Sequence, residues 1–217
     1  MLLLRPPGVY PAQGDTALLA ESLAREGPLR GVRCLDLGTG SGAIALAAAS
    51  RGARVTAVDV SWLALATAGA NAWLHRCRIR LRHGDLTGPV RGRRFDLVLS
   101  NPPYVPAERP GSRRRGVARA WDAGPDGRLL LDRICREAPG LLARGGVLLV
   151  VQSSLADVRA TVRALERAGL RAEVVARRRQ RFGPVMTARA VWFESRGLID
   201  PGVREEELAV IRGARPA

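Results

Sequence analysis

The chain has 217 residues, of which 47% are hydrophobic and 25% charged, so it is long enough to form one globular domain with a buried core. No apolar run approaches the roughly 20 residues that a membrane-spanning helix needs, and the apolar stretch at residues 1–4 is too short for a signal peptide. We therefore expect a single domain over residues 1–217, a cytoplasmic location and no membrane association.

All 35 basic residues are arginines, and the net charge is +15. This charge is typical of a nucleic-acid partner, but a composition rich in arginine, alanine and glycine is also what a GC-rich genome produces without selection for a ligand. The cysteines and histidines form no CxxC pair and no cluster with carboxylates, so we expect reduced thiols and no metal site. These residues are Cys34, Cys77, Cys135, His75 and His83.

The first half of the chain alternates amphipathic and apolar segments. A short N-terminal helical segment is expected at about 10–27, with Asp15 capping its helix. The predicted elements follow in the order helix 15–25, strand 31–37, helix 42–50, strand 54–59, helix 62–75, strand 79–83 and strand 95–100.

The second half begins with a loop over 106–125, rich in arginine, glycine and proline, whose role the sequence leaves open. The elements expected after it are helix 127–142, strand 147–152, helix 157–168, strand 171–176 and strand 188–194. The last two strands have no predicted helix between them and are expected to form an antiparallel hairpin. A polar tail from about 195 carries a short helix near 205–211. The pattern predicts an α/β fold with a mostly parallel seven-stranded sheet and helices on both faces.

Acidic residues stand at the ends of three successive predicted strands, namely Asp36, Asp59 and Asp85. Between the first two, Gly38 and Gly40 allow the backbone to turn tightly and to approach a ligand. The three carboxylates suit an amino group, ribose hydroxyls and an adenine amine, in that order. This set fits S-adenosylmethionine better than NAD, because nothing here is built for a pyrophosphate, and the run lacks the Lys and Ser/Thr of a P-loop. Any one of these acids alone would also suit a helix cap or a turn.

The tetrapeptide Asn101-Pro102-Pro103-Tyr104 directly follows the predicted strand 95–100, at the edge where open α/β sheets bind ligands. The Asn101 side-chain oxygen and the Pro102 carbonyl can together accept two hydrogen bonds from one NH2 group. Two such acceptors aim the lone pair of a weakly nucleophilic nitrogen at a methyl donor, and Tyr104 offers a planar face to a flat group. The pattern indicates N-methyl transfer. The alternative is a Pro-Pro turn, with Asn101 as a helix cap and Tyr104 packed in the core.

The glycine-rich run, the three acids, Leu86 and the tetrapeptide together resemble the HemK-type protein-glutamine N5-methyltransferases, which have the class I, Rossmann-like methyltransferase fold. Val9-Tyr10 with Asp15-Thr16, and the segment 120–128 followed by Asp132-Arg133, are similar to the short eukaryotic and archaeal branch of that family. In two positions the chain departs from the family pattern, because Gly14 replaces a Glu and the proline is displaced to Pro11.

The resemblance, with the glycine-rich turn, implies a set of cofactor-binding residues: Thr16, Asp36, Gly38, Gly40, Asp59, Asp85, Leu86 and Asn101. It also implies that Asn101, Pro102, Pro103 and Tyr104 hold the glutamine amide, with Asn101, Pro102 and Tyr104 catalytic. The implied substrate is the GGQ glutamine of a class 1 release factor, and the implied partner is a small zinc-binding activator subunit. A nucleobase of the adenine-N6 type, or a small amide or amine metabolite, is the alternative acceptor. A non-catalytic scaffold is a third hypothesis.

Overall fold

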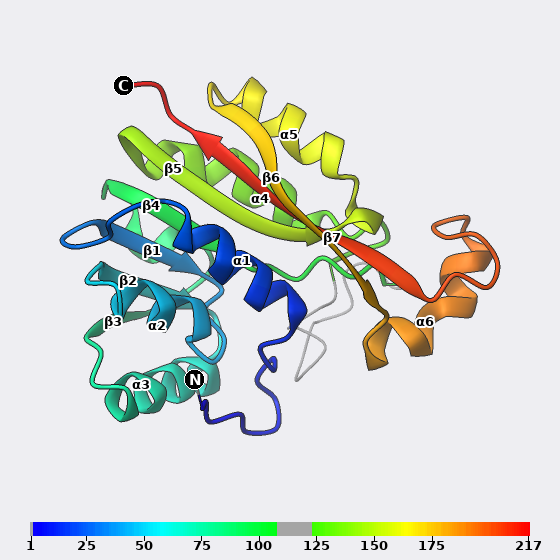
Figure 1. Ribbon diagram of the computed structural model, residues 1–217, viewed down its shortest axis with the longest axis horizontal. Helices are drawn as coiled ribbons and strands as arrows, with labels where there is room; N and C mark the ends of the chain where they lie inside the picture. Colours follow the sequence, from blue (N-terminus) through cyan, green and yellow to red (C-terminus); the bar gives the residue numbers. More distant parts are fainter. Residues whose placement is uncertain (1, 108–122) are drawn as a thin grey trace.

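The computed structural model describes residues 2–107 and 123–217 and has a seven-stranded sheet at its centre (Figure 1). The strand order is β3-β2-β1-β4-β5-β7-β6. The strands are β1 (Arg33–Leu37), β2 (Arg54–Asp59), β3 (Ile79–His83), β4 (Phe95–Ser100), β5 (Leu142–Ser153), β6 (Arg171–Arg181) and β7 (Glu205–Ala214). Strands β1 to β5 run parallel to one another, whereas β7 is antiparallel to both β5 and β6. The predicted fold class is confirmed.

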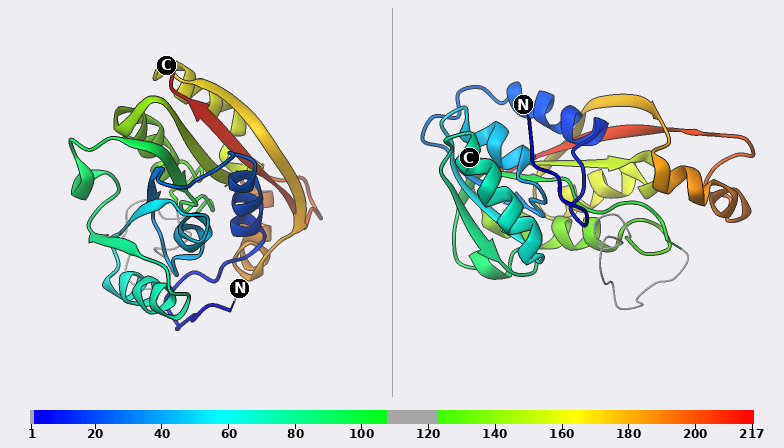
Figure 2. Two further views of the ribbon diagram at one scale, coloured as in Figure 1. Left: turned by 60° about the vertical axis from the view of Figure 1, so that its left-hand side comes forward. Right: turned by 90° about the horizontal axis from the view of Figure 1, so that it is seen from below.

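Helices cover both faces of the sheet, with α1 and α2 on one face and α4 and α5 on the other (Figures 1 and 2). The α-helices are α1 (Gly14–Ala24), α2 (Ala43–Ala49), α3 (Trp62–Leu74), α4 (Leu129–Glu137), α5 (Val158–Arg167) and α6 (Pro184–Ser195). Three short 3-10 helices are η1 (Gly88–Val90), η3 (Ala138–Leu141) and η4 (Ser154–Ala156). Among the residues described, no helix is long and apolar enough to cross a membrane.

The core lies along the central strands, where Leu35 of β1, Leu99 of β4 and Leu149 of β5 are completely buried. A strand with helices on both faces buries the side chains on both of its sides, which explains why the middle of these strands is mostly apolar and shows no strict polar alternation. The hydrophobic contacts of these runs hold the carboxyl ends of β1, β2 and β4 side by side. Loops that follow these strands therefore meet at one edge of the sheet.

The C-terminal region differs from the prediction in two elements. Residues 188–194, expected to be a strand, belong to helix α6, which lies beyond the ends of β6 and β7 (Figure 1). Pro184 stands in its first turn, where proline is favoured, and the buried residues Met186, Ala190 and Phe193 recur at helical spacing. The antiparallel partner of β6 is instead β7, so the hairpin is formed with a helix between its strands.

The prediction of a polar tail with a short helix near 205–211 is wrong, because these residues form β7 in the interior of the sheet. Its segment Leu208–Ile211 is completely buried between β5 and β6. A short apolar run has no periodicity that separates a buried strand from a buried helix, so the neighbouring strands decided its conformation.

Smaller differences lie at the ends of elements. The helix predicted over 127–142 is shorter: α4 ends at Glu137, the turn η3 contains Pro139, and β5 already begins at Leu142. Strand β6 continues to Arg181, so the arginines at 177–179 lie in a strand rather than in a loop. The residue at the N-cap of α1 is Gln13, so Asp15 does not have the capping role expected of it.

Candidate active site

One cavity of about 510 Å³ opens at the carboxyl edge of the sheet, beside the ends of β1, β2 and β4. All of the residues predicted for the site line this cavity. They are Thr16, Asp36, Gly38, Gly40, Asp59, Asp85, Leu86, Asn101, Pro102, Pro103 and Tyr104. The structure thus brings together residues that span 88 positions of the chain from Thr16 to Tyr104.

Asp36 and Asp59 organise the glycine-rich turn between β1 and α2. The Thr39 hydroxyl donates to Asp36 Oδ2 over 2.6 Å, and the Gly40 amide donates to Asp59 Oδ2 over 2.9 Å. Gly42 has φ +83°, and a Cβ there would lie 3.0 Å from the Ala68 Cβ, so this position must be glycine for α2 to pack against α3. The turn is therefore held in shape by the same carboxylates that we expect to bind the cofactor.

Asp36 is 2% exposed, and burial raises the pKa of its carboxyl group to about 7. The hydrogen bond from the Thr39 hydroxyl opposes this rise in pKa, whereas the nearby carboxylate of Asp59 adds to it. A cation placed against Asp36 would favour the charged carboxylate and lower this pKa.

The third predicted acid, Asp85, lines the cavity and also pairs with Arg133 of α4, whose Nη1 lies 2.9 Å from Asp85 Oδ2. The sequence does not reveal this pairing. The next residue, Leu86, has φ +43°, which is unfavourable for a branched side chain, yet its side chain is 8% exposed and lines the cavity. The fold therefore constrains the loop after β3 to present Leu86 to the cavity.

The tetrapeptide Asn101-Pro102-Pro103-Tyr104, called here the reaction tetrapeptide, begins where β4 ends. Ser100 Oγ donates to the Leu37 carbonyl over 2.9 Å, which ties the end of β4 to the end of β1. Asn101 Nδ2 donates to Thr16 Oγ1 over 3.2 Å. Within the part of the chain that the structure describes, no donor reaches Asn101 Oδ1 or the Pro102 carbonyl oxygen. The two acceptors predicted from the sequence are thus available at the cavity.

Tyr104 packs in the core, as the alternative interpretation expected, and it also lines the cavity, as a role in substrate binding would require. Its hydroxyl donates to Asp15 Oδ2 over 2.9 Å. Burial, and then the charge of Asp15, hold the pKa of the Tyr104 hydroxyl well above its usual value, so the hydroxyl keeps its proton and donates it.

The sequence interpretation missed Tyr10 and Asp15 as site residues, although both line the cavity. Asp15 is 1% exposed, and its Oδ2 also accepts from the Tyr10 hydroxyl over 2.8 Å. Only the meeting of α1 with the loop after β4 places Asp15 beside Tyr104. The signal in the sequence was the two family-like pairs Val9-Tyr10 and Asp15-Thr16, of which only Thr16 was assigned a role in the site.

Gly14, the departure from the family pattern, also has a structural reason. A Cβ at this position would overlap the side-chain oxygen of Gln180, at the end of β6. Gln180 Nε2 in turn donates to Glu206 Oε1 of β7 over 2.9 Å. A side chain at position 14 would therefore have to displace the end of the Gln180 side chain and disturb its hydrogen bond to Glu206.

The two ends of the loop after the tetrapeptide are joined by backbone hydrogen bonds between Val105 and Ala123 and between Ala107 and Gly124. Gly127 follows with φ +74°, and a Cβ there would overlap the Tyr104 carbonyl oxygen. The middle of the predicted loop 106–125, including the arginines at 113–115 and the family-like residues 120–122, lies outside the described residues.

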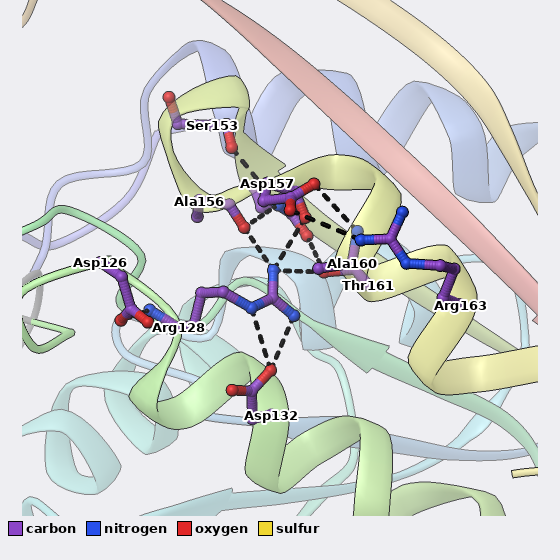
Figure 3. A network of polar contacts seen from close by, with 10 residues as sticks. Asp126, Arg128, Asp132, Ser153, Ala156, Asp157, Ala160, Thr161 and Arg163 are labelled. Carbon is purple, nitrogen blue, oxygen red and sulfur yellow. Dashed lines mark hydrogen bonds and ion pairs between the residues drawn. The ribbon is translucent and has the colours of Figure 1, made fainter. Parts of the chain in front are cut away.

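Arg128 anchors this segment to the fold (Figure 3). Its guanidinium is buried and donates to the carbonyls of Ala156 and Asp157 and to the Thr161 hydroxyl. On its other side it pairs with Asp132 over 2.7 Å. The start of α4 is thereby fixed to the turn between β5 and α5, which holds the chain that follows the cavity loop in place.

No group of three His, Cys, Asp or Glu side chains that could hold a metal ion occurs among residues 2–107 and 123–217. The described thiols of Cys34 and Cys135 are buried, and burial raises the pKa of both.

A family model described as the methyltransferase small domain matches residues 2–113. A Methanocaldococcus jannaschii protein named as a protein N5-glutamine methyltransferase is 35% identical over 185 residues, which is 85% of this chain and 92% of that protein. The Geobacter sulfurreducens release factor glutamine methyltransferase is 38% identical over 151 residues. That match covers 66% of this chain but only 53% of the Geobacter protein, so the chain spans about half of its length.

Solved structures agree on the fold. The E. cuniculi Mtq2–Trm112 complex, described as responsible for methylation of the eRF1 termination factor, matches with a TM-score of 0.68 over 96% of this chain and 99% of that chain, at 23% identity. A T. thermophilus 16S rRNA methyltransferase, RsmC, bound to AdoMet and guanosine, matches with a TM-score of 0.62 over 96% of this chain and 46% of that chain, at 21% identity. At these identities the two structures support the fold alone. From its family model and its archaeal relative, this chain is a methyltransferase of the methyltransferase small domain family and belongs with the protein N5-glutamine methyltransferases.

Proposed function

We propose that this protein transfers a methyl group from S-adenosylmethionine to the side-chain amide nitrogen of a glutamine in a protein. The observation that carries the proposal is the pair of unengaged acceptors at the cavity, Asn101 Oδ1 and the Pro102 carbonyl oxygen. The relatives named as glutamine methyltransferases support an amide, and not another nitrogen, as the acceptor.

The residues of the cavity fit S-adenosylmethionine. A Cβ built on Gly38 or Gly40 meets no protein atom within 4 Å, so the space beside the glycine turn is open to a ligand. Asp36 lies at one side of this turn for a cationic amino group, and Asp59 lies at the other for hydroxyl groups. Leu86 supplies an apolar wall. Thr16, Asp85 and Asn101 complete the proposed cofactor-binding set.

When bound, S-adenosylmethionine supplies an electrophilic methyl group on a sulfonium. The protein's task is to orient an amide nitrogen whose lone pair is delocalised. Asn101 Oδ1 and the Pro102 carbonyl oxygen would each accept a hydrogen bond from one N–H group of the substrate amide. These two hydrogen bonds favour a tetrahedral nitrogen with its lone pair directed at the methyl group. Pro103 keeps this backbone rigid, and the ring of Tyr104 bounds the slot. No strong base is required, because the nitrogen carries a positive charge once it has accepted the methyl group, and this cationic amide is strongly acidic and loses one proton to water to give the neutral N-methyl amide.

The proposed substrate is a class 1 release factor, with its GGQ glutamine as the acceptor. The Geobacter relative is named for a release factor, and a Bradyrhizobium diazoefficiens relative, 42% identical over 125 residues, is named for ribosomal protein uL3. Both names indicate glutamines presented by proteins of the translation apparatus. We also propose a small activator subunit, by analogy with the Mtq2–Trm112 complex, and a cytoplasmic location.

A second candidate acceptor is a nucleobase. The net charge of +15 favours it, because a basic protein attracts the phosphate backbone of nucleic acids. The same tetrapeptide chemistry would hold the exocyclic NH2 of adenine.

The choice between a glutamine and a nucleobase as acceptor is tested by incubating the protein with isotopically labelled S-adenosylmethionine and a release factor, with and without a Trm112-type subunit. We expect mass spectrometry to place one methyl group on the GGQ glutamine. Asn101→Ala should lower this rate by about 10²–10³-fold, because one of two preorganised acceptors is lost. A release factor with Asn in place of that glutamine is the matched substrate control. Label that enters DNA or RNA and not protein would contradict the proposal.

A further inference from the structure

A continuous chain of hydrogen bonds joins the two ends of the reaction tetrapeptide through the first turn of α1. From one end, Asn101 Nδ2 donates to Thr16 Oγ1 over 3.2 Å, and Thr16 Oγ1 donates to Asp15 Oδ1 over 3.2 Å. From the other end, the Tyr104 hydroxyl donates to Asp15 Oδ2 over 2.9 Å. Asp15 is thus the common acceptor of a path that begins at Asn101 and ends at Tyr104.

The polarity of this chain determines which way the Asn101 amide faces. The Thr16 hydroxyl has one proton, and that proton is donated to Asp15. Its oxygen can therefore only accept from Asn101, so the NH2 of Asn101 must face Thr16. The Asn101 Oδ1 is then directed away from Thr16, which leaves it free for an NH2 group in the cavity. If Asp15 did not take the Thr16 proton, the opposite orientation of Asn101 would also form a hydrogen bond.

Resting on the proposed function, we propose that Asp15 is a positioning residue of the methyl-transfer site, which orients Asn101 through Thr16 and holds Tyr104 directly. Asp15 does not touch the reacting atoms in this role. It selects the acceptor face of Asn101 and sets the distance between the two ends of the tetrapeptide.

A carboxylate is needed at position 15 because four donors converge on it. Oδ1 accepts from the Thr16 amide over 2.6 Å and from the Thr16 hydroxyl, and Oδ2 accepts from the hydroxyls of Tyr10 and Tyr104. An ionised carboxylate can accept all four, whereas an asparagine presents one oxygen and one NH2 group. Asp15 is 1% exposed, so its carboxylate receives little stabilisation from water. It lies in the first turn of α1, where the helix dipole stabilises a negative charge.

A purely structural role for Asp15 is the competing explanation. The same bonds tie the N-terminal segment, through Tyr10, to the body of the domain. Loss of such a tie would lower stability and cofactor binding together. Loss of positioning would lower turnover more than cofactor affinity. Thr16 and Asn101 would be perturbed, but the glycine turn, Asp36 and Asp59 have no hydrogen bond to Asp15 among the described contacts.

The test compares Asp15→Asn with Glu21→Gln, which makes the same acid-to-amide change on an exposed part of the same helix, where Glu21 pairs with Arg178. We expect Asp15→Asn to lower kcat at least about tenfold, with the cofactor Kd within about threefold of wild type. Glu21→Gln should leave both values within about twofold. In a double-mutant cycle, Tyr104→Phe should cost less in the Asp15→Asn background than in the wild type.

A second measurement does not depend on the acceptor. The side-chain amide of Asn101, observed by ¹H–¹⁵N NMR with cofactor bound, should shift in Asp15→Asn and stay unchanged in Glu21→Gln. An unchanged Asn101 signal, a kcat within threefold of wild type, or an equal loss of kcat and cofactor binding would each overturn the inference. If wild-type protein methylates no glutamine, the proposed function fails, and the NMR comparison still decides the role of Asp15.

Discussion

At the scale of single residues, the site depends on how burial changes the chemistry of a carboxylate. Asp36 is buried at the end of β1, and burial raises the pKa of its carboxyl group to about 7. Because this value lies above the unfolded value of 3.8, the contribution of Asp36 to the stability of the ligand-free protein is present below about pH 4 and is lost as the pH rises through about 7. Binding of a cation against Asp36 has the opposite dependence, because it requires the charged form.

Because binding of a cation requires the charged form of Asp36, the affinity for the cofactor should vary with pH. The affinity for S-adenosylmethionine should fall by up to about tenfold for each pH unit below about 7, as Asp36 takes up a proton. Isothermal titration calorimetry between pH 5.5 and 8 measures this dependence. Asp36→Asn should bind more weakly at pH 8 and lose most of the variation. A wild-type affinity that is constant over this range would exclude the assigned role of Asp36.

At the scale of elements, one buried arginine joins two segments that are far apart in the sequence. Arg128, just before α4, supplies hydrogen bonds to the carbonyls of Ala156 and Asp157 at the start of α5 (Figure 3). The Thr161 hydroxyl, which accepts from Arg128, donates to Gln152 Oε1 of β5 over 2.6 Å, so the network continues into the sheet. The Ala156 carbonyl also accepts from Gln152 Nε2 over 3.0 Å, and the Asp157 carbonyl accepts from the Thr161 amide over 3.3 Å. Removal of the guanidinium would therefore take from each carbonyl its charged donor and leave it with one weaker hydrogen bond.

We therefore predict that Arg128→Ala destabilises the protein by about 2–4 kcal/mol, because the two carbonyls and the Thr161 hydroxyl each lose a hydrogen bond from a buried charged group. For a chain of this length the corresponding fall in Tm is on the order of 5–15 °C. The control is Arg163→Ala, which removes an exposed arginine paired with Asp157 at 3.7 Å and should cost less than about 0.5 kcal/mol. Thermal unfolding by circular dichroism separates the two. Equal effects of the two substitutions would contradict an anchoring role for Arg128.

At the scale of the whole molecule, the sheet is completed by its last strand. β7 lies between β5 and β6, and β6 has no other strand neighbour in the described sheet. Removal of β7 would therefore detach β6 as well and expose the sides of α1 and α5 that pack against these two strands, one helix on each face of the sheet. Residues 205–214 are a central part of the fold and not an appended tail.

A matched pair of substitutions tests this arrangement. Val210, completely buried in β7, and Val191, 73% exposed in α6, can each be changed to Asp. We expect Val210→Asp to cost more than about 4 kcal/mol, because a charge is buried without a partner, and Val191→Asp to cost less than about 0.5 kcal/mol. Denaturant unfolding of both variants gives the comparison. A tolerated Val210→Asp would mean that the C-terminal residues are not in the sheet.

The sequence by itself determined the strands β1 to β4 almost to the residue, the α/β class and eleven of the residues that line the cavity, but not Tyr10 or Asp15. It could do so because each strand is an apolar run with a polar or glycine-rich end, and because parallel strands bring those ends to one edge of a sheet. For the same reason Asp36, Asp59 and Asn101 could be expected together without knowledge of any contact between them.

Tertiary structure alone decided the rest. Residues 188–194 became a helix and 205–214 a strand because of the neighbours they meet, which short apolar runs do not encode. Asp15 became the acceptor for Tyr104, and Asp85 the partner of Arg133, across 89 and 48 positions of sequence. Such pairs depend on how helices dock on the sheet, and docking is set by the packing of the whole core rather than by any local pattern.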